Sequence, residues 1–204
     1  EVRFYDNERL RQRIPFPSKA DNCATRLEMF CYETRRVEVD FGGSGGIAYL
    51  GVMPCPTRVE YDWTTYAAPV PLVTGEVLTD QMDSLGMRFE AINALPGLPD
   101  KAILFNTSHP TGNDDDLVTP GYGWGNDFPL RKVVVIAEND IDVAPADGIV
   151  DDPNDSGLGG ILAIDFSSDR WLREALVMDI EGYEPSWIVL KDAFGFELVP
   201  PILI

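Results

Sequence analysis

Short apolar segments separated by turn-forming residues dominate this sequence. The 204 residues include 16 Pro and 18 Gly, which recur with Asn and Asp between the apolar segments and leave little room for long helices. RRVEVDF at 35–41 places Val and Phe side chains on one face and acidic side chains on the other, as in a half-buried strand. Similar segments follow at short spacing: TRVEYDW, GMRFEAI, KAILF, KVVVIAE, GGILAIDF, EALVMDI, SWIVLKD and FELVP.

Eight or more short strands with turns between them predict an all-β fold, a two-sheet antiparallel β-sandwich or jelly roll. GGSGG at 42–46 reads as a flexible turn before a second strand at 47–53, so 37–53 is predicted to form a β-hairpin. At most one or two short helices are expected. One is TDQMDSLG, capped by Thr79 and ended by Gly86, and ATRLEMFCYE at 24–33 also has helical spacing of its apolar residues.

Charge divides the chain unevenly. The formal net charge is −18, which argues against nucleic acid as a partner because phosphate binding needs a basic surface. Residues 1–36 nevertheless hold eight basic and six acidic side chains, whereas 37–204 hold eight basic and 28 acidic ones. We therefore expect an N-terminal arm or extension with one hairpin at 1–59, packed on its own acidic body or on a neighbouring subunit, and a β-sandwich domain at 60–204. An ordinary irregular lead-in with a solvated charged face is the simpler alternative.

The cysteines and the start of the chain bear on the compartment. The sequence begins at Glu1 without a signal-peptide pattern, as expected of a mature exported protein or of a trimmed start. Cys23, Cys31 and Cys55 allow one disulfide, most easily closed between Cys23 and Cys31, but the pairing is not readable and reduced core cysteines are the alternative. No apolar run is long enough to span a membrane. A secreted or otherwise exported protein is the prediction.

Negative charge concentrates in three turn regions, NTSHPTGNDDDL at 106–117, AENDID at 137–142 and DGIVDDPNDSGLGG at 147–160. Calcium takes six to eight oxygen ligands, which Asp- and Asn-rich loops with Gly can supply. Carboxylates brought together without a cation would repel one another. The spacing is not that of an EF-hand, and solvated turns in which Asp and Asn only shape the backbone are the alternative.

The order YDW, TGEVLTDQMDSLGMRFEA, ILFNTSHPTGNDDDLVTP, VVVIAEN, DDPNDSGLGGILAIDFSS, ALVMDIE resembles a family of uncharacterised exported β-sandwich domains of aquatic bacteria, often found in proteins with a PEP-CTERM sorting tail. The resemblance covers about residues 60–200. It implies a jelly roll similar to carbohydrate-binding modules, with acidic loops as ion ligands. The Ca²⁺ ligands carried over by position are Asp114, Asp116, Glu138, Asp152, Asn154, Asp155 and Asp179.

Two departures from the family stand out. His109 takes the place of the usual Asn, and FELVPPILI ends the chain without a basic tail, so membership in the sorting system is not supported. Asn106 and Asn154 both begin N-glycosylation sequons, and a glycan on Asn154 would compete with its use as a calcium ligand.

Aromatic residues indicate a binding surface. GYGWGNDF at 121–128 presents Tyr122 and Trp124 between glycines, where flat rings can stack on a sugar; alternatively Trp124 folds back to cap the core. Trp63, Trp171 and Trp187 lie in strand-like patterns and are expected in the core. His109 is expected to be a surface turn residue, because no paired nucleophile accompanies it.

The sequence thus predicts a non-enzymatic, exported, calcium-stabilised β-sandwich that binds carbohydrate or a surface protein partner. The chain has a single His and no nucleophile elbow, P-loop or HExxH pattern, and a carboxylate pair for hydrolysis or lyase chemistry is the minor alternative. The competing class is a structural or assembly subunit that docks through residues 1–59.

Overall fold

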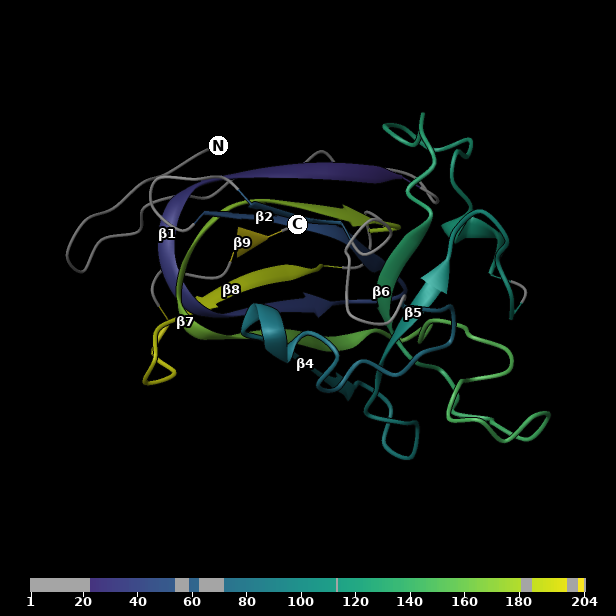
Figure 1. The fold of residues 1–204 in the computed structure, drawn as a ribbon. Helices are drawn as coiled ribbons and strands as arrows, with labels where there is room; N and C mark the ends of the chain where they lie inside the picture. The colour runs from purple at the N-terminus through teal and green to yellow at the C-terminus, as the bar shows by residue number, and fades with distance from the viewer. Residues whose placement is uncertain are drawn as a thin grey trace.

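Nine strands and two single 3-10 turns make up the described part of the chain in a computed structural model (Figure 1). The structure describes residues 23–53, 59–62, 72–112, 114–180, 185–197 and 202–203. The strands are β1 (Ala24–Phe41), β2 (Gly46–Met53), β3 (Val59–Asp62), β4 (Met87–Asn93), β5 (Ala102–Asn106), β6 (Lys132–Ile136), β7 (Gly160–Met178), β8 (Trp187–Lys191) and β9 (Ile202–Leu203). The 3-10 turns are η1 (Asp83–Leu85) and η2 (Asp115–Leu117).

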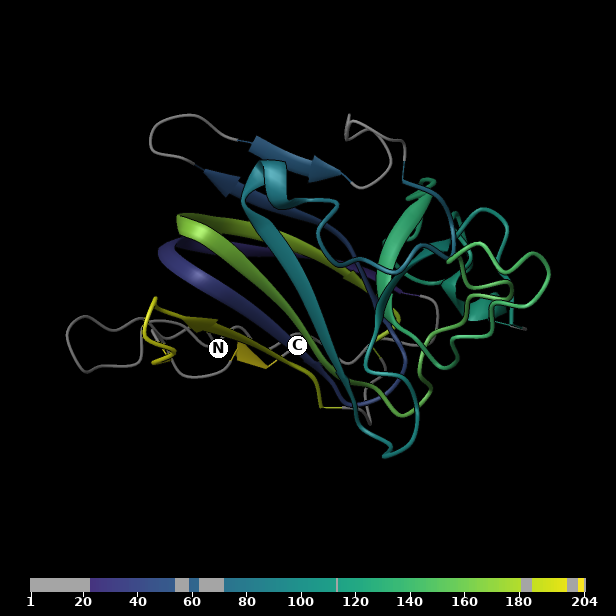
Figure 2. The ribbon, with the colours of Figure 1, turned by 60° about the horizontal axis from the view of Figure 1, so that its bottom comes forward.

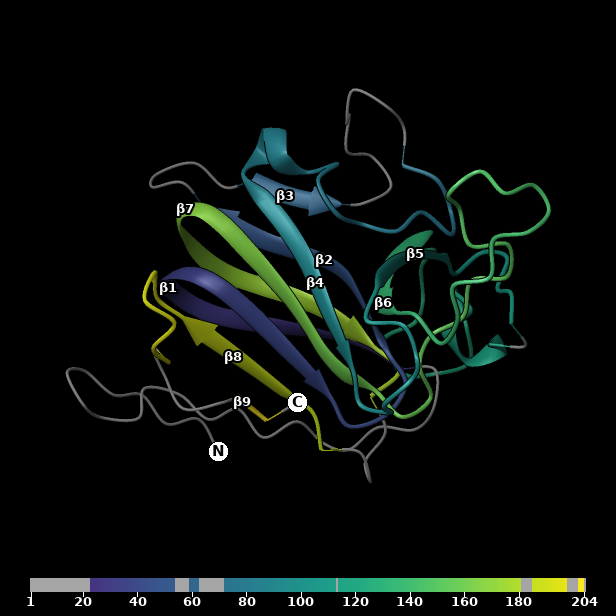
Figure 3. The ribbon, with the colours of Figure 1, turned by 90° about the horizontal axis from the view of Figure 1, so that it is seen from below.

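The strands form two antiparallel layers joined through two long strands, β1 and β7. These two pair along most of their length, from Ala24 opposite Met178 to Phe41 opposite Gly160, and both bend near the middle. One layer has the order β5-β6-β2-β7-β1, with β3 beside β2, and the other has the order β4-β7-β1-β8-β9. Figure 3 shows the second layer in front of β2, and Figure 2 shows the two layers from the side. The predicted all-β sandwich is confirmed.

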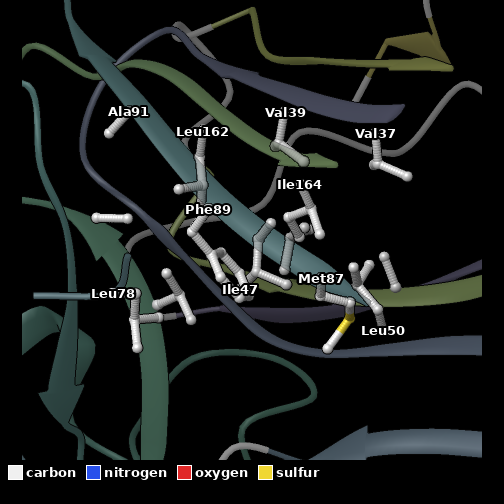
Figure 4. Close-up of a cluster of buried hydrophobic side chains, with 14 of the residues drawn as sticks. Val37, Val39, Ile47, Leu50, Leu78, Met87, Phe89, Ala91, Leu162 and Ile164 are labelled. Atoms are coloured by element: carbon white, nitrogen blue, oxygen red, sulfur yellow. The ribbon is translucent and has the colours of Figure 1, made fainter. Parts of the chain in front are cut away.

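The core lies between the layers. Alternate residues of β4 are buried and exposed, so Met87, Phe89 and Ala91 face inward. They meet inward-facing apolar side chains of β1, β2 and β7, among them Val39, Ile47, Leu50, Leu162 and Ile164 (Figure 4). This two-residue period is the property that lets short alternating segments form a sandwich.

Ion pairs link neighbouring strands on the outer face of the second layer. Arg36 on β1 pairs with Glu38, with Asp165 on β7 and with Glu90 on β4. Lys191 on β8 pairs with Glu38 at 2.6 Å. Burial by itself would raise the pKa of Glu38, but the hydrogen bonds from Lys191 and Arg36 outweigh it and lower that pKa.

Three sequence-based expectations of secondary structure are wrong. Residues 24–33 belong to β1 and are not helical, because pairing with β7 outweighs the helical spacing of three apolar residues. The predicted hairpin at 37–53 does not form, because β7 lies between β1 and β2. The part of β1 within the predicted hairpin belongs to the other layer, where it pairs with β7 and β8. The helix at 79–86 is reduced to the 3-10 turn η1, which ends at Gly86 with φ 69° as predicted but begins after Met82 and not at Thr79.

The division into an arm at 1–59 and a sandwich at 60–204 stays a prediction. β1 and β2 are interior strands of the sandwich and pair with β7. Residues 1–22 lie outside the described residues, so docking through them stays a prediction. Within the part of the chain that the structure describes, no helix has the length and apolar character needed to cross a membrane.

A Cys23–Cys31 disulfide does not fit this fold. Cys23 is buried just before β1 and Cys31 lies within it. Eight residues of strand separate their Cα atoms by roughly 20 Å or more, whereas a disulfide needs about 4 to 7 Å. The side chain of Cys31 and all of Cys55 lie outside the described residues.

We predict that Ile164→Ala lowers the free energy of unfolding by about 2 to 5 kcal/mol, because it removes a fully buried side chain between the layers. Ile92→Ala, on a side chain that is 54 % exposed, should change it by less than about 0.5 kcal/mol. Denaturant unfolding measures both. Equal effects of the two substitutions would contradict the assigned core.

Candidate functional site: a buried carboxylate cluster

The first and third acidic regions pack against each other at one end of the sandwich. The teal and green loops after β5, after β6 and before β7 gather at this end in Figures 1 to 3. Gly112 N donates to Asp152 Oδ1 at 2.9 Å, and Thr111 Oγ1 donates to the Pro153 carbonyl at 2.6 Å. Gly112 has φ 68°, and a Cβ there would lie 2.5 Å from the Asn154 side chain. A glycine is therefore required where the two loops meet.

Four of the predicted ligands come together in this region. Asp114, just before η2, interacts by side-chain hydrogen bonds with Asp116 and Asp155. The charges of Asp179 and Asp116 act in turn on Asp155. Asp114, Asp155 and Asp179 are 7 %, 4 % and 1 % exposed, so these three carboxyls are almost completely removed from water. We call Asp114, Asp116, Asp155 and Asp179 the carboxylate cluster.

Burial and mutual repulsion raise the pKa values in the cluster. Loss of water is the largest cause for Asp114, followed by its hydrogen bond with Asp116 and the charge of Asp155, and together they raise its pKa to about 10. Burial also raises the pKa of Asp155, to about 7, even though the Gly45 amide opposes the shift. Without a cation, at least one proton is therefore held in the cluster at neutral pH.

The glycine-rich turn between β1 and β2 supplies two donors to the cluster. Gly45 N donates to Asp155 Oδ2 at 2.6 Å, and Ser44 Oγ donates to Asp179 Oδ2 at 2.6 Å. Asp179 itself has φ 58° and donates its amide to the Cys23 carbonyl. Sequence reasoning missed Ser44 and Gly45, because GGSGG reads as a flexible linker until β1, β2 and β7 are placed side by side.

Asp114 Oδ2 and Asn154 Oδ1 are among the oxygen atoms of this region that are buried without a hydrogen-bond partner. Leaving a buried acceptor unsatisfied costs about 1 to 3 kcal/mol, so native proteins rarely retain one without a reason. Both belong to predicted ligands and come from the two loops that pack together.

The remaining predicted ligands lie at the periphery. Glu138 is exposed and accepts a hydrogen bond from Asn154 Nδ2. Asp152 is exposed and accepts a hydrogen bond from the Gly112 amide. Of the two asparagines that begin glycosylation sequons, Asn154 is half-buried, and Asn106 is half-buried and accepts from the Ser108 amide. None of the described residues forms a group of three or more His, Cys, Asp or Glu side chains in metal-holding geometry. A cation would therefore require these side chains to lose protons and rotate toward a common point.

The other acidic turns have a different character. Both Asp142 oxygens accept backbone amides, from Asp147 and Gly148, and Asp151 Oδ2 accepts those of Val143 and Ala144. These carboxylates shape an exposed loop, as in the alternative interpretation of the sequence. The acidic regions thus divide into turn-forming carboxylates and the buried cluster.

The aromatic loop lies just beyond η2. Asn126 is buried and makes two hydrogen bonds that fix the loop. Its Nδ2 donates to the Val118 carbonyl, and its backbone carbonyl accepts the Gly121 amide. The Trp124 carbonyl accepts the Ala24 amide of β1, but the side chains of Tyr122 and Trp124 are 73 % and 65 % exposed. Trp124 therefore does not cap the core.

The structure also places the histidine and two of the three other tryptophans that the sequence analysis considered. His109 is exposed in a turn after β5, as expected. Trp171 on β7 and Trp187 on β8 are half-buried and not fully in the core, and Trp63 lies outside the described residues.

Comparison with known proteins gives no match: no protein-family model, no curated protein and no solved structure matches this chain. The resemblance to exported β-sandwich domains of aquatic bacteria therefore stays a prediction.

We predict that protein kept free of divalent cations melts at a lower temperature at about pH 8 than at about pH 5. The folded-state pKa values of Asp114 and Asp155 are raised above the unfolded value of about 4. Between these values the folded state binds more protons than the unfolded state, so the free energy of unfolding falls as pH rises.

Asp114→Asn should flatten this fall and raise the melting temperature of the cation-free protein at about pH 8. Asp115→Asn removes the same charge from the neighbouring exposed residue and should keep the wild-type slope. Thermal melts followed by circular dichroism provide the measurement. A melting temperature that rises over this pH range would contradict the raised pKa values.

Proposed function

We propose that this chain is an exported, non-enzymatic β-sandwich module that is stabilised by Ca²⁺ and binds carbohydrate through its aromatic loop. The observation that carries the proposal is the pair of partnerless buried oxygens, Asp114 Oδ2 and Asn154 Oδ1, beside a cluster of desolvated carboxyls.

Ca²⁺ is the ligand that best fits the donor set. All side chains of the carboxylate cluster offer hard oxygen atoms. Hydrogen bonds from Ser44 and Gly45 fix the orientation of two of these carboxylates. A divalent cation would replace the protons of the cluster, offset its repulsion and use the partnerless oxygens. Backbone carbonyls of the two loops would complete a shell of six to eight ligands.

The burial of the cluster favours binding over catalysis. A general acid and base must reach a substrate, as the two carboxyls on either side of a glycosidic bond do. Three of the four carboxyls here are at most 7 % exposed, which suits enclosure of an ion and not contact with a polymer.

Carbohydrate binding rests on the loop at 118–128. Its backbone is fixed at both ends, by Asn126 and by the buried pair Thr107–Thr119, whose hydroxyl oxygens lie 2.5 Å apart. Exposed rings on a fixed loop can stack on sugar rings at little entropic cost. η2 leads directly into the loop at 118–128. An ion bound by Asp114 and Asp116 would therefore also restrict the first residues of that loop.

Calcium in 100-fold excess over its Kd should raise the melting temperature by about 5 to 10 °C relative to protein in a chelator, since the ion binds the folded state. Asp155→Asn should remove most of this increase, and Asp115→Asn should retain it. Isothermal titration calorimetry with Ca²⁺ gives the affinity directly. Identical melting curves with calcium and with chelator would eliminate the calcium proposal.

Trp124→Ala should reduce retention on an immobilised polysaccharide by about tenfold or more if the ring stacks on sugar. Phe194→Ala, at a more exposed ring in the turn after β8, is the control and should bind as the wild type does. A screen against several immobilised polysaccharides, with and without calcium, makes the measurement. Failure of every polysaccharide to retain the folded wild-type protein would overturn this part of the proposal and leave the calcium site standing.

A further inference from the structure

The aromatic loop, residues 118–128, begins directly after the part of the carboxylate cluster that lies around η2. Asp114 precedes η2 and Asp116 lies within it. η2 ends at Leu117, whose side chain is completely buried. The next carbonyl, that of Val118, accepts Asn126 Nδ2 at 2.8 Å. The first and last parts of the loop are therefore joined two residues after a member of the cluster.

A second connection joins the middle of the loop to another member of the cluster. The Asp179 amide donates to the Cys23 carbonyl at 2.8 Å, and the amide of the next residue, Ala24, donates to the Trp124 carbonyl at 3.1 Å. At Gly125, which has φ 75°, a Cβ would lie only 2.3 Å from the Ala24 carbonyl oxygen. The loop therefore packs so closely on the start of β1 that residue 125 has to be glycine.

These two connections make the position of the exposed rings depend on the cluster. Tyr122 lies between the two points of attachment, and Trp124 forms one of them through its backbone. One attachment leads to Asp116 and the other leads to Asp179. A change in the separation of these two carboxylates would shift one attachment relative to the other, and the rings would move with it.

A cation in the cluster would change this separation. The side chain of Asp114 is hydrogen-bonded to Asp116 and Asp155, while its Oδ2 has no hydrogen-bond partner. Ca²⁺ holds its oxygen ligands at about 2.3 to 2.6 Å, so these carboxylates would exchange their mutual hydrogen bonds for contacts with the ion. Asp179 already accepts a hydrogen bond from Ser44 Oγ. The adjustment therefore falls on η2 and on the residues that follow it.

We infer that cation binding at the carboxylate cluster and ligand binding at the aromatic loop are coupled, so that each strengthens the other. The inference rests on the calcium and carbohydrate proposal and adds the regulation of its two sites. A cation would replace hydrogen bonds between like groups by ionic contacts and so restrain both attachments of the loop. A sugar that stacks on the rings would then lose less conformational freedom on binding. By thermodynamic reciprocity, the sugar strengthens cation binding by the same factor.

Calorimetry with a polysaccharide that the wild type retains measures the coupling. Calcium should lower the Kd for this polysaccharide by about tenfold, and saturating polysaccharide should lower the Kd for calcium by the same factor. Equal polysaccharide affinity with calcium and with chelator overturns the coupling and leaves both sites of the proposed function in place. If no polysaccharide is retained, the coupling falls together with the carbohydrate proposal.

Amide hydrogen exchange tests the connection without any sugar. Calcium should slow the exchange of the Ala24 and Gly121 amides by on the order of tenfold, because both donate to carbonyls of the loop. The Phe194 and Phe196 amides, which donate to Asp192 Oδ1 in the turn after β8, should exchange at unchanged rates. Calcium binding without slower exchange at the two loop amides overturns the coupling and leaves the calcium site standing. Absence of calcium binding removes the site and the coupling with it.

Asn126→Asp separates the coupling from the calcium site. The substitution keeps the shape of the side chain but removes the donor to the Val118 carbonyl. Calcium should bind with a Kd within about threefold of the wild-type value, whereas its effect on exchange at Gly121 should be lost. Asn139→Asp adds the same charge and removes a donor to the Asp152 carbonyl, so it is the matched control and should keep the effect. An Asn126→Asp variant that binds calcium and keeps the slow exchange at Gly121 overturns the proposed connection.

Discussion

The fold depends on the pairing of β1 with β7. Strands of 18 and 19 residues are far longer than the usual five or six. A flat sheet of that length would expose its apolar side chains, so both strands bend, with register shifts near Glu28 and Thr34. At the bend Thr34 is buried and its hydroxyl lies 2.9 Å from the carbonyl oxygens of both Arg36 and Lys191, so it can donate to either of these backbone groups. One pair of strands thereby contributes to both layers and encloses the core.

This arrangement also determines where chemistry can occur. The bend closes one end of the sandwich, and the loops collect at the other. There the turn after β1, the residue after β7 and the loops after β5 and before β7 meet, and each brings one or two groups of the carboxylate cluster or their donors. The donors Ser44 and Gly45 lie 135 and 110 positions from the carboxylates that they bind. The geometry of the cluster is a consequence of strand order.

The sequence indicated most of the strands, apart from the first half of β1, but not their pairing. Alternation identified β4 and the second half of β1, because a two-residue period is a local property. It could not show that β7 intervenes between β1 and β2, because GGSGG suits a hairpin as well as a connection between layers. The same limit applies to the site. Composition indicated acidic loops, but only the fold separates the buried Asp114 and Asp155 from Asp142 and Asp151, whose oxygens are occupied by backbone amides.

The buried carboxylates and the exposed phenylalanines are opposite departures from what folding alone would favour. A chain with a net charge of −18 has enough surface carboxylates to remain soluble, so burying three more adds cost without adding solubility. Exposing the rings of Phe194 and Phe196 on a turn that Asp192 forms unaided likewise gives the isolated fold nothing. Such local conflicts with stability concentrate at functional positions. Because the two lie at opposite ends of the sandwich, the energetic effects of substitutions in them should be additive, so the carboxylates can be varied without changing the surface at the other end.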